Sequence, residues 1–302
     1  MIFINSEKKS SNFIINYNFG KRTWFGSGGN SSVFIKVNTL DKLIFLFKFL
    51  PKTIPVFLLG AGSNVIIRDG GFKGIVLKLG KEFSKIEIKK SNSSIVVGSA
   101  VRDSELAKFC QNNNIGGLEF LKGIPGTIGG NVKMNAGCYG NEISDYFISC
   151  RVIDRNSKIK KLTKKDLKFG YRKSSIHKNL TIIDAEFKYN YKKNSFIKKN
   201  LDKISILRKN TQPFAIRTGG STFRNPSKTK SAWKLIDSIG YRGKRLGGAK
   251  VSQKHSNFLV NDEHASSLDI ELLGEEIKEN IKKKCKINLE WEIERIGCFK
   301  KI

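Results

Sequence analysis

The feature of this sequence that most constrains its fold is the glycine-rich segment at residues 123–140. It opens with Gly-Ile-Pro-Gly-Thr-Ile-Gly-Gly-Asn and holds six glycines in eighteen residues. Such a density is costly, because glycine loses more backbone freedom on folding than any other residue. Backbone pressed against a flat or phosphate-bearing ligand explains the density most simply, and a purely structural loop is the alternative.

A second glycine turn, Gly60-Ala61-Gly62-Ser63-Asn64, follows an apolar strand expected at residues 55–59. The turn lacks the G-x-G-x-x-G spacing and another strand follows it, which argues against a Rossmann nicotinamide site. Its glycines still allow consecutive amides to converge on a phosphate, and the Ser63 and Asn64 side chains add donors. A tight turn without a ligand is the other interpretation.

Length and pattern together predict several lobes of mixed structure. At 302 residues the chain is too long for one small core, and its strands and helices do not alternate regularly, which indicates the α+β class. We expect lobes at 1–85, 86–195 and 196–302, with the Lys- and Asn-rich stretch 191–200 as the last boundary. The expected strands are 33–37, 55–59, 65–67, 86–88, 95–98, 150–153, 182–189, 256–260 and 287–293. The expected helices are 39–50, 103–113, 201–209, 232–238 and 268–284.

Two of these elements have patterns that assign their faces. The helix at 268–284 has an apolar face made of Leu272, Leu273, Ile277 and Ile281. Residues 287–293 alternate apolar and polar side chains, which predicts a strand with its carboxylates on the face opposite the core. Those carboxylates are Glu290, Glu292 and Glu294.

The formal net charge of +30 points first to a nucleic-acid surface. Lys and Arg number 15 in residues 1–100, 20 in 101–200 and 21 in 201–302, so the charge is spread along the chain. No nucleic-acid-binding motif accompanies it, and the richness in Asn, Ile and Phe is what an AT-rich coding sequence would produce. We therefore expect no nucleic-acid partner, whereas an anionic small-molecule substrate fits the positive field.

Simple patterns argue against several other classes. The longest apolar stretch, residues 43–50, is interrupted by Lys48 and is far shorter than the roughly 20 residues of a membrane-spanning helix. The first residues, MIFINSEKKSSNF, have their lysines after a short apolar piece, the wrong order for a signal peptide. Five cysteines without a C-x-x-C pair predict reduced thiols, and three histidines without ligand spacing predict no metal site. We expect no obligate protein partner.

Three single residues are candidates for chemistry. In Phe169-Gly170-Tyr171-Arg172, the arginine offers a fork that engages both oxygens of a carboxylate or phosphate. In Gly219-Gly220-Ser221, a hydroxyl follows two glycines, and no histidine neighbours it in sequence to indicate a hydrolase triad. The plain alternatives for Arg172, Ser221 and Glu292 are an exposed arginine, a capped turn and a solvated strand face.

Taken together, these segments resemble the UDP-N-acetylenolpyruvoylglucosamine reductase family over residues 23–297. Each motif is weak singly, and the set in the family's order is highly specific. The motifs are Leu59–Asn64, Gly117–Phe120 with Gly123–Gly126, Asn135–Gly137, Phe169–Arg172, Gly220–Ser221 with Asn225–Pro226, Gly247–Ala249 with Val251–Ser252, His255 with Asn257–Phe258, and Glu290–Gly297.

The resemblance implies an NADPH-dependent flavoenzyme that reduces UDP-N-acetylglucosamine enolpyruvate to UDP-N-acetylmuramate for peptidoglycan synthesis in the cytoplasm. The fold would be a two-lobed FAD-binding region of the vanillyl-alcohol-oxidase-like (PCMH-type) superfamily, followed by an α+β substrate-binding lobe. FAD, held non-covalently, would lie with its pyrophosphate on residues 60–64 and its ring against residues 123–140. Its contacts would be Gly60, Ala61, Gly62, Ser63, Asn64, Gly123, Ile124, Pro125, Gly126, Thr127, Gly129, Gly130, Asn135, Ala136 and Gly137.

The resemblance also implies residue roles. By family position, Arg172 would polarise the substrate carboxyl, Ser221 would donate the proton, and Glu292 would help to hold the enolic intermediate. The nucleotide-sugar substrate would be contacted by Tyr171, Lys209 and Asn225. The length fits the shorter form of the family, which lacks an extra tyrosine-bearing loop.

One departure from the family pattern is plain. Where relatives often read Trp-Phe-Arg-x-Gly-Gly, this chain has Gly26 in place of the arginine, a change that concerns a local contact near the flavin lobe. Two alternatives remain open from the sequence. Another FAD-dependent oxidase of the same superfamily would consume oxygen and often hold its flavin covalently. A nucleic-acid-binding protein would bind DNA with a steep salt dependence and carry no flavin.

Overall fold

The computed structural model describes residues 13–300. Its first lobe is built on a β-α-β unit, in which β2 (Ser31–Val37) is followed by α1 (Leu40–Phe49) and β3 (Val56–Leu58). The sheet has the order β1-β2-β5-β3, with β5 (Phe72–Leu79) parallel to β2 and β3, and β1 (Phe13–Tyr17) antiparallel at the edge. The central strand β5 was not predicted, because a glycine and two lysines interrupt its apolar pattern.

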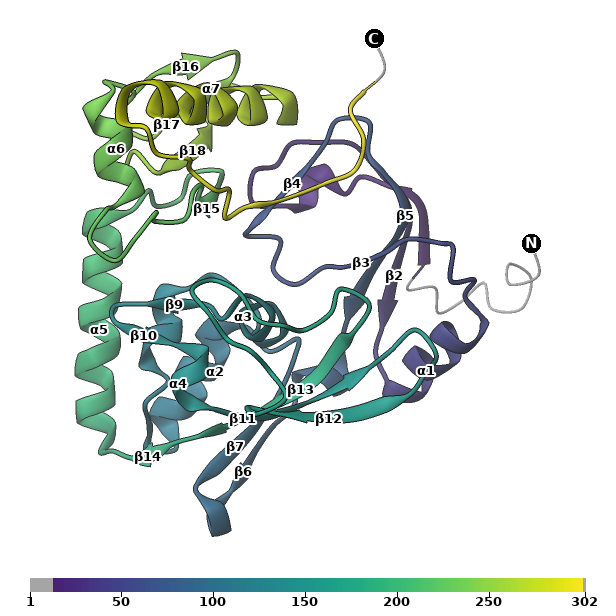
Figure 1. Cartoon of the computed structure of the whole chain (residues 1–302). Coiled ribbons are helices and arrows are strands. Elements are labelled where there is room, and N and C mark those ends of the chain that lie inside the picture. Colours follow the sequence, from purple (N-terminus) through teal and green to yellow (C-terminus); the bar gives the residue numbers. More distant parts are fainter. Residues whose placement is uncertain (1–12, 301–302) are drawn as a thin grey trace.

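The second lobe is a five-stranded antiparallel sheet covered by helices on one face (Figure 1). In sheet order its strands are β12 (Ile159–Thr163), β11 (Phe147–Ile153), β13 (Thr181–Lys188), β7 (Ser94–Gly98) and β6 (Ile86–Lys89). The covering helices are α2 (Asp103–Asn112) and the short α3 (Ile128–Met134). No helix was predicted at α3, which lies inside the glycine-rich segment.

A long helix, α5 (Asn194–Thr211), leads out of the second lobe towards the C-terminal lobe, as Figure 1 shows. The predicted helix at 201–209 was therefore too short. Ile197, Leu201 and Ile204 form its buried stripe, and the first two pack with Ala107 of α2. The Lys- and Asn-rich stretch 191–200 has the composition of a linker, which predicts a boundary. Its residues from 194 onward form the first turns of this helix, and its lysines are exposed to solvent. The lobe boundaries at residues 85 and 195 stay predictions.

The C-terminal lobe is a four-stranded antiparallel sheet with two helices, and its mixed content agrees with the predicted α+β class. Its strands, in sheet order, are β15 (Thr218–Ser221), β18 (Phe258–Asn261), β17 (Ala249–Val251) and β16 (Arg245–Leu246). The helices are α6 (Ala232–Ser238) and α7 (Ser267–Cys285). Ser266 caps α7 through its Oγ, which accepts the amide of Asp269 at 3.0 Å. Of the predicted apolar face, Leu272 is 46% exposed, and Ile270 is buried instead.

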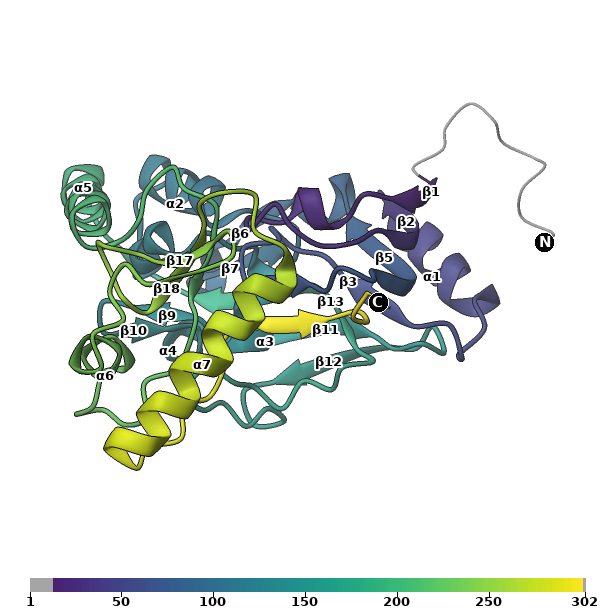
Figure 2. The ribbon, with the colours of Figure 1, turned by 90° about the horizontal axis from the view of Figure 1, so that it is seen from above.

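The end of the chain returns to the first lobe. β19 (Glu294–Ile296) pairs in parallel with β4 (Val65–Ile67), and Figure 2 shows this segment beside α7. The predicted strand at 287–293 is wrong as an element, because only Trp291 in it forms a bridge, with Phe223. The alternation predicts the burial of two of the apolar residues, since Leu289 and Ile293 are each 3% exposed.

Charged side chains tie this return to α7. Arg68, next to β4, donates to both carboxylate oxygens of Glu271, at 3.0 and 3.2 Å. Arg295 of β19 lies 3.6 Å from Glu271 and 2.8 Å from Glu275. Asp69 accepts the amides of Ser267 and Leu268 at the start of α7. These contacts hold the C-terminal helix against the first lobe.

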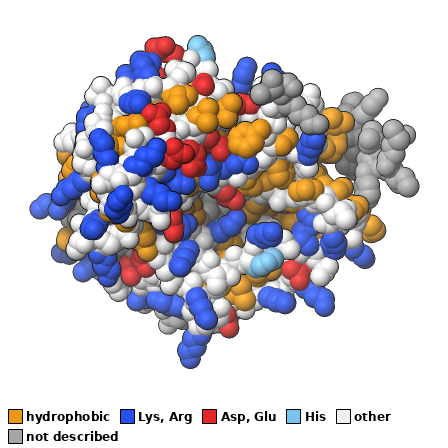
Figure 3. Space-filling model, turned by 45° about the horizontal axis from the view of Figure 1, so that its top comes forward, with side chains coloured by type: hydrophobic (Ala, Val, Ile, Leu, Met, Phe, Trp, Pro, Cys, Tyr) orange, Lys and Arg blue, Asp and Glu red, His pale blue; other side chains and the backbone are white. Residues whose placement is uncertain are grey.

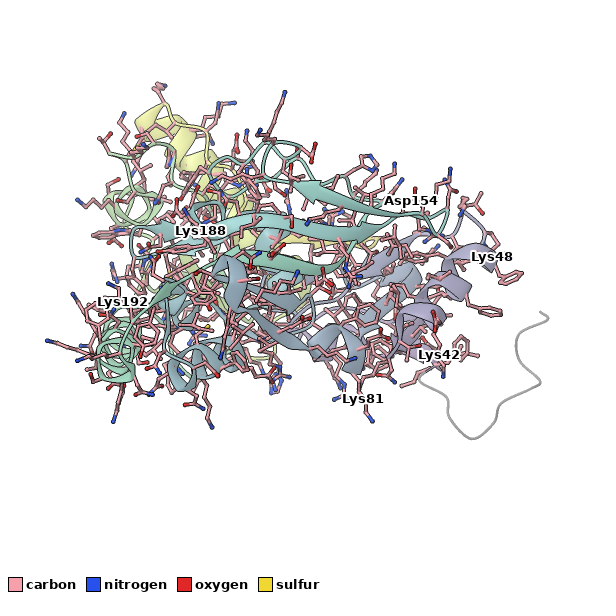
Figure 4. All side chains as sticks on the ribbon, turned by 90° about the horizontal axis from the view of Figure 1, so that it is seen from below. Lys42, Lys48, Lys81, Asp154, Lys188 and Lys192 are labelled. Atoms are coloured by element: carbon pink, nitrogen blue, oxygen red, sulfur yellow. The ribbon has the colours of Figure 1, made fainter. Side chains whose placement is uncertain are left out.

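Basic side chains are spread over the surface. Figure 3 shows Lys and Arg over the whole of one face, with Asp and Glu among them. On the underside, Figure 4 shows Lys42 and Lys48 on α1 at one end and Lys192 near α5 at the other. In these two views the basic side chains do not gather in a single patch.

The expectations about membrane helices, disulfides and metal sites can be compared with the residues that the structure describes. Within residues 13–300, no helix is long and apolar enough to cross a membrane. The argument against a signal peptide rests on residues 1–13, of which 1–12 lie outside the described residues. All five cysteines are described and none forms a disulfide. No set of three His, Cys, Asp or Glu side chains in the described part of the chain lies close enough together to hold a metal ion.

We expect Glu271→Ala to lower the free energy of unfolding by about 2–3 kcal/mol, because it leaves Arg68 and Arg295 without their buried partner. The value lies below the roughly 3–5 kcal/mol typical of a fully buried pair, because both arginines are partly solvated, at 26% and 27% exposure. Urea denaturation measures it. Glu279→Ala, an exposed position on the same helix, is the control and should change stability by about 0.5 kcal/mol at most.

Candidate active site

A cavity of about 1210 Å³ brings the two glycine segments together. It is lined by Gly60 and Ala61 from the first lobe and by a second group from the glycine-rich segment and α5. That group is Ile124, Pro125, Gly126, Thr127, Gly129, Gly130 and Lys209. The other residues predicted to contact a flavin are not part of the lining. They are Gly62, Ser63, Asn64, Gly123, Asn135, Ala136 and Gly137.

The cavity wall is strongly basic. Its cations are Lys52, Lys78, Arg102, Lys122, Lys133, Arg155, Lys178, Arg208 and Lys209, and its only acids among the described residues are Asp103 and Glu294. Burial lowers the pKa of Lys78, and the nearby Arg102 and Lys36 lower it further. Crowded positive charges of this kind fit an anionic ligand, which would relieve their repulsion.

The wall also holds a polar group without a partner. Ser99 Oγ is buried and makes no hydrogen bond to any described residue. Buried hydroxyls in proteins are nearly always hydrogen-bonded, so this one is available to a ligand. Apolar surface from Trp24, Phe57 and Pro125 lines the same space. Together these features fit an elongated ligand that has both anionic and flat apolar parts.

Glycine occurs in the glycine-rich segment for two different structural reasons. A Cβ on Gly123 would lie 2.8 Å from Cys138 Sγ, one on Gly129 would lie 2.9 Å from Ser99 Cβ, and one on Gly137 would lie 2.5 Å from Asn141 O. These three are required by packing against the protein itself. Gly130 is exposed, and its Cβ would meet only Thr127 Oγ1, at 3.7 Å. The density therefore reflects tight packing as well as access to the cavity.

Arg172 and Glu292 form the second feature of the site. Arg172 Nε donates to Glu292 Oε1 at 3.1 Å, and its Nη2 donates to Gly137 O at 2.6 Å. The two side chains are only 20% and 15% exposed, so Glu292 is not on a solvated strand face. Burial raises the pKa of Glu292, and the attraction of Arg172 and Arg224 opposes that rise. Arg172 has a φ of 54°, a left-handed conformation that non-glycine residues rarely adopt.

Backbone pairing brings the segment that directly follows Ser221 alongside residues 290–292. Glu292 N donates to Thr222 O at 2.8 Å, and Arg224 N donates to Glu290 O at 2.9 Å. Ser221 directly precedes Thr222 at the end of β15 and has no hydrogen-bond partner for its Oγ among the described residues. A Cβ on Gly220 would lie 4.0 Å from Ser63 O, so the Gly60–Asn64 turn approaches the same place.

The side chains of Asn64 and Asn135, two of the predicted ligand contacts, bind other parts of the protein. Asn64 Nδ2 donates to Glu292 O at 3.1 Å and lies 3.1 Å from Met134 Sδ, which links the first glycine turn to the acid. Asn135 is fully buried, donates to Gly170 O at 3.0 Å and accepts the amide of Ser144 at 2.9 Å. Both asparagines therefore hold the segments that carry Arg172 and Glu292.

A smaller pocket of about 330 Å³ lies near Arg172. It is lined by Tyr171, Lys173, Arg224, Asn225, Pro226 and Glu290. The amide of Asn225 donates to Tyr171 Oη at 3.4 Å, so two of the three residues predicted to contact a nucleotide sugar lie together. The third, Lys209, lines the large cavity instead. Its place there was not expected from the sequence.

Comparison with known proteins gives the family. The model of the UDP-N-acetylenolpyruvoylglucosamine reductase C-terminal domain matches residues 212–296, and the model of the FAD binding domain matches residues 31–163. The enzyme of that name from Rickettsia massiliae (strain Mtu5) is 45% identical over 282 residues, 93% of this chain and 94% of the relative. The one from Rickettsia canadensis (strain McKiel) is 43% identical over 94% of this chain and 95% of its own.

A solved structure agrees with the sequence matches. The crystal structure of UDP-N-acetylenolpyruvylglucosamine reductase from Thermus caldophilus has a TM-score of 0.81 at 28% sequence identity, and covers 94% of this chain and 98% of that chain. The chain belongs to the UDP-N-acetylenolpyruvoylglucosamine reductase family. This confirms the family resemblance and the predicted fold, an FAD-binding region followed by a C-terminal lobe.

The departure at Gly26 from the pattern expected for this reductase family has a local structural counterpart. Gly26 has a φ of 66°, and a Cβ there would lie 3.2 Å from Cδ and 3.3 Å from Nε of Arg217. The space above Gly26 is thus filled by an arginine from the segment just before β15. A side chain at position 26 would have to displace it and would also strain the backbone.

The variants Gly129→Ala and Gly130→Ala distinguish a glycine that packing requires from one that has room for a side chain. We expect Gly129→Ala to lower the free energy of unfolding by about 1–3 kcal/mol, because its Cβ overpacks against Ser99. Gly130→Ala, in the same helix, should leave the free energy of unfolding unchanged or raise it by about 0.5–1 kcal/mol. Alanine loses less backbone entropy than glycine when the helix forms. Urea denaturation of both variants without ligand measures the difference. Equal losses would contradict the inference that packing restricts Gly129 and leaves room at Gly130.

Proposed function

We propose that this chain is a cytoplasmic NADPH-dependent flavoenzyme that reduces UDP-N-acetylglucosamine enolpyruvate to UDP-N-acetylmuramate for peptidoglycan synthesis. The observation that carries the proposal is the Arg172–Glu292 pair, whose Glu292 amide donates to the carbonyl of Thr222, the residue next to Ser221 in the chain. A cation, an acid and a proton donor are the groups that reduction of an enol ether next to a carboxylate requires. The names of the relatives supply the identity of the substrate.

FAD fits the large cavity by the chemistry of its wall. Gly60, Ala61 and residues 124–130 would hold it, the surrounding lysines and arginines would neutralise its pyrophosphate, and Ser99 Oγ would gain a partner. We propose that the flavin is held non-covalently. Cys138, the thiol nearest the proposed ring site, donates to Phe120 O, and burial raises its pKa to about 12, so it is no nucleophile at neutral pH.

When bound, FAD would take a hydride from NADPH and deliver it to the methylene carbon of the enolpyruvyl group. Arg172 would stabilise the negative charge that develops on the enol-carboxylate, because its guanidinium is already fixed in place by Glu292 and Gly137 O. Ser221 would donate the proton to the adjacent carbon. Glu292 would hold Arg172 and the enolic intermediate. Tyr171, Asn225 and Lys209 would contact the nucleotide sugar.

The absorbance spectrum of the purified protein tests the proposal first. Flavin bands that acid precipitation releases into the supernatant, together with NADPH oxidation that depends on the enolpyruvyl sugar nucleotide, are the expected result. A protein that shows no flavin bands and takes up no added FAD is not this enzyme. Rapid oxygen consumption without the sugar nucleotide would favour the oxidase alternative.

We expect Arg172→Lys to lower kcat by about 10²-fold or more while leaving the folded state intact. Lysine keeps the charge but loses the fork that engages Glu292 and the substrate carboxyl together. Steady-state kinetics and thermal unfolding measure the two effects. Arg242→Lys, on a surface ion pair with Asp237, is the control and should leave kcat unchanged. A wild-type rate for Arg172→Lys would remove Arg172 from the mechanism.

Ser221→Ala separates the two halves of the reaction. NADPH should still bleach the flavin absorbance at the wild-type rate, because that half needs no proton on the enolpyruvyl carbon. Reoxidation by the sugar nucleotide should slow by about 10²–10⁴-fold, the usual effect of losing a positioned general acid. Stopped-flow absorbance measures both rates, with Ser227→Ala as the control. Equal slowing of both halves would mean that Ser221 shapes the pocket and does not supply the proton.

A further inference from the structure

Asp103 is a buried carboxyl group that the proposed reaction does not use. It is 1% exposed, begins α2 and lines the large cavity. The sequence predicts only that a helix begins at this residue. Burial raises its pKa to about 8, while the Gly126 amide, the Asn131 side chain and the Arg208 guanidinium oppose that rise. Burying a carboxyl group costs desolvation free energy unless hydrogen bonds compensate for it, so the contacts of Asp103 indicate its role.

Those contacts converge on the cavity wall. Asp103 Oδ2 accepts the amide of Gly126 at 2.7 Å, and Oδ1 accepts Asn131 Nδ2 at 2.5 Å. The amide of Asp103 also donates to Gly126 O, at 3.3 Å. Gly126 has no room for a side chain, since its Cβ would lie 2.6 Å from Asn131 Oδ1 and 2.8 Å from Asp103 Oδ2. Asp103 thus holds Gly126 through both its side chain and its main chain.

These bonds close the end of a short backbone ladder. Gly129 N donates to Ser99 O at 2.9 Å, Ile128 N donates to Val101 O at 3.0 Å, and Arg102 bridges Thr127. The segments 99–103 and 126–129 therefore face each other along one side of the cavity. At Gly126 the chain leaves the ladder and continues into the cavity wall at residues 124 and 125. Asp103 is the last contact before that turn.

We propose that Asp103 is a positioning residue for the flavin, which fixes the turn at residues 124–127 in the conformation that binds FAD. The inference rests on the proposed FAD site. A turn that samples several conformations binds its ligand more weakly, in proportion to the fraction of time it spends in the competent one. Aspartate suits this role because its short side chain presents two acceptors, one to each of two donors.

Two substitutions distinguish the geometry of this clamp from its charge. Asp103→Ala removes both acceptors and leaves the Gly126 amide and Asn131 without partners. Asp103→Asn keeps both hydrogen bonds, because the Asn131 side-chain amide can turn over and present its oxygen to the new NH₂ group. The matched control is Asp184→Ala. Asp184 is a buried carboxylate of the same lobe that pairs with Arg151 and does not line the cavity.

Each purified protein is stripped of FAD and titrated with it, with the quenching of flavin fluorescence as the measure of Kd and thermal unfolding as the measure of stability. We expect Asp103→Ala to raise the Kd by about tenfold or more, which corresponds to the loss of one or two hydrogen bonds. Asp103→Asn should stay within about threefold of wild type. Asp184→Ala should lose stability and keep the wild-type Kd.

The outcomes separate cleanly. A Kd for Asp103→Ala no higher than that for Asp184→Ala overturns the proposal, and so does a Kd for Asp103→Asn as high as that for Asp103→Ala. Should Asp103→Ala fail to fold, Asn131→Ala removes one donor of the same clamp, and an unchanged Kd for that variant is equally fatal. A wild-type protein that binds no FAD at all would contradict the proposed function. It would also overturn the role proposed for Asp103, which depends on FAD binding.

Discussion

The structure depends on the return of its last strand to the first lobe. The β19–β4 pairing places residues 290–296 between two lobes that are far apart in sequence, and the Arg68–Glu271 ion pair prevents the C-terminal helix from moving away. Asn64 then reaches Glu292 O, and Thr222 O accepts the Glu292 amide. The backbone of Glu292 is therefore held by a side chain of the first lobe and by a carbonyl of the C-terminal lobe. Its position relative to the cavity follows from lobe packing.

This arrangement explains how a half-buried ion pair can persist beside a cavity. Burying Arg172 and Glu292 costs solvation, and their mutual attraction repays that cost only when further polar contacts are satisfied. Gly137 O supplies one such contact for the arginine. Because the glycine-rich segment carries that carbonyl, the same backbone forms the cavity wall and positions the guanidinium. Binding of a ligand to the wall and orientation of Arg172 are thus structurally linked.

The sequence predicted the elements whose patterns are local. α2, α6 and α7 were predicted close to their observed bounds, because each is a continuous local segment of helical pattern. It failed where burial is decided by distant partners. β5 is central in its sheet although two lysines interrupt it, and the first turns of α5 are helical although they read as a linker. Residues 287–293 alternate like a strand, yet within them only Trp291 forms a bridge, with Phe223, and the pairing with β4 begins at Glu294. The chain there bridges two lobes.

The sequence predicted which segments form the site, but not which partner each side chain in them contacts. The motifs identified the turn at 60–64 and the segment at 123–140, and both reach the cavity. Residue type alone could not show that Asn64 and Asn135 are engaged with backbone, because an asparagine that binds a ligand and one that braces a loop have the same sequence signal. Asp103 was missed for the same reason, since the start of a helix already explains an aspartate. A glycine or a carboxylate acquires its specific role only from what faces it across the fold, and that information lies in the packing of the lobes.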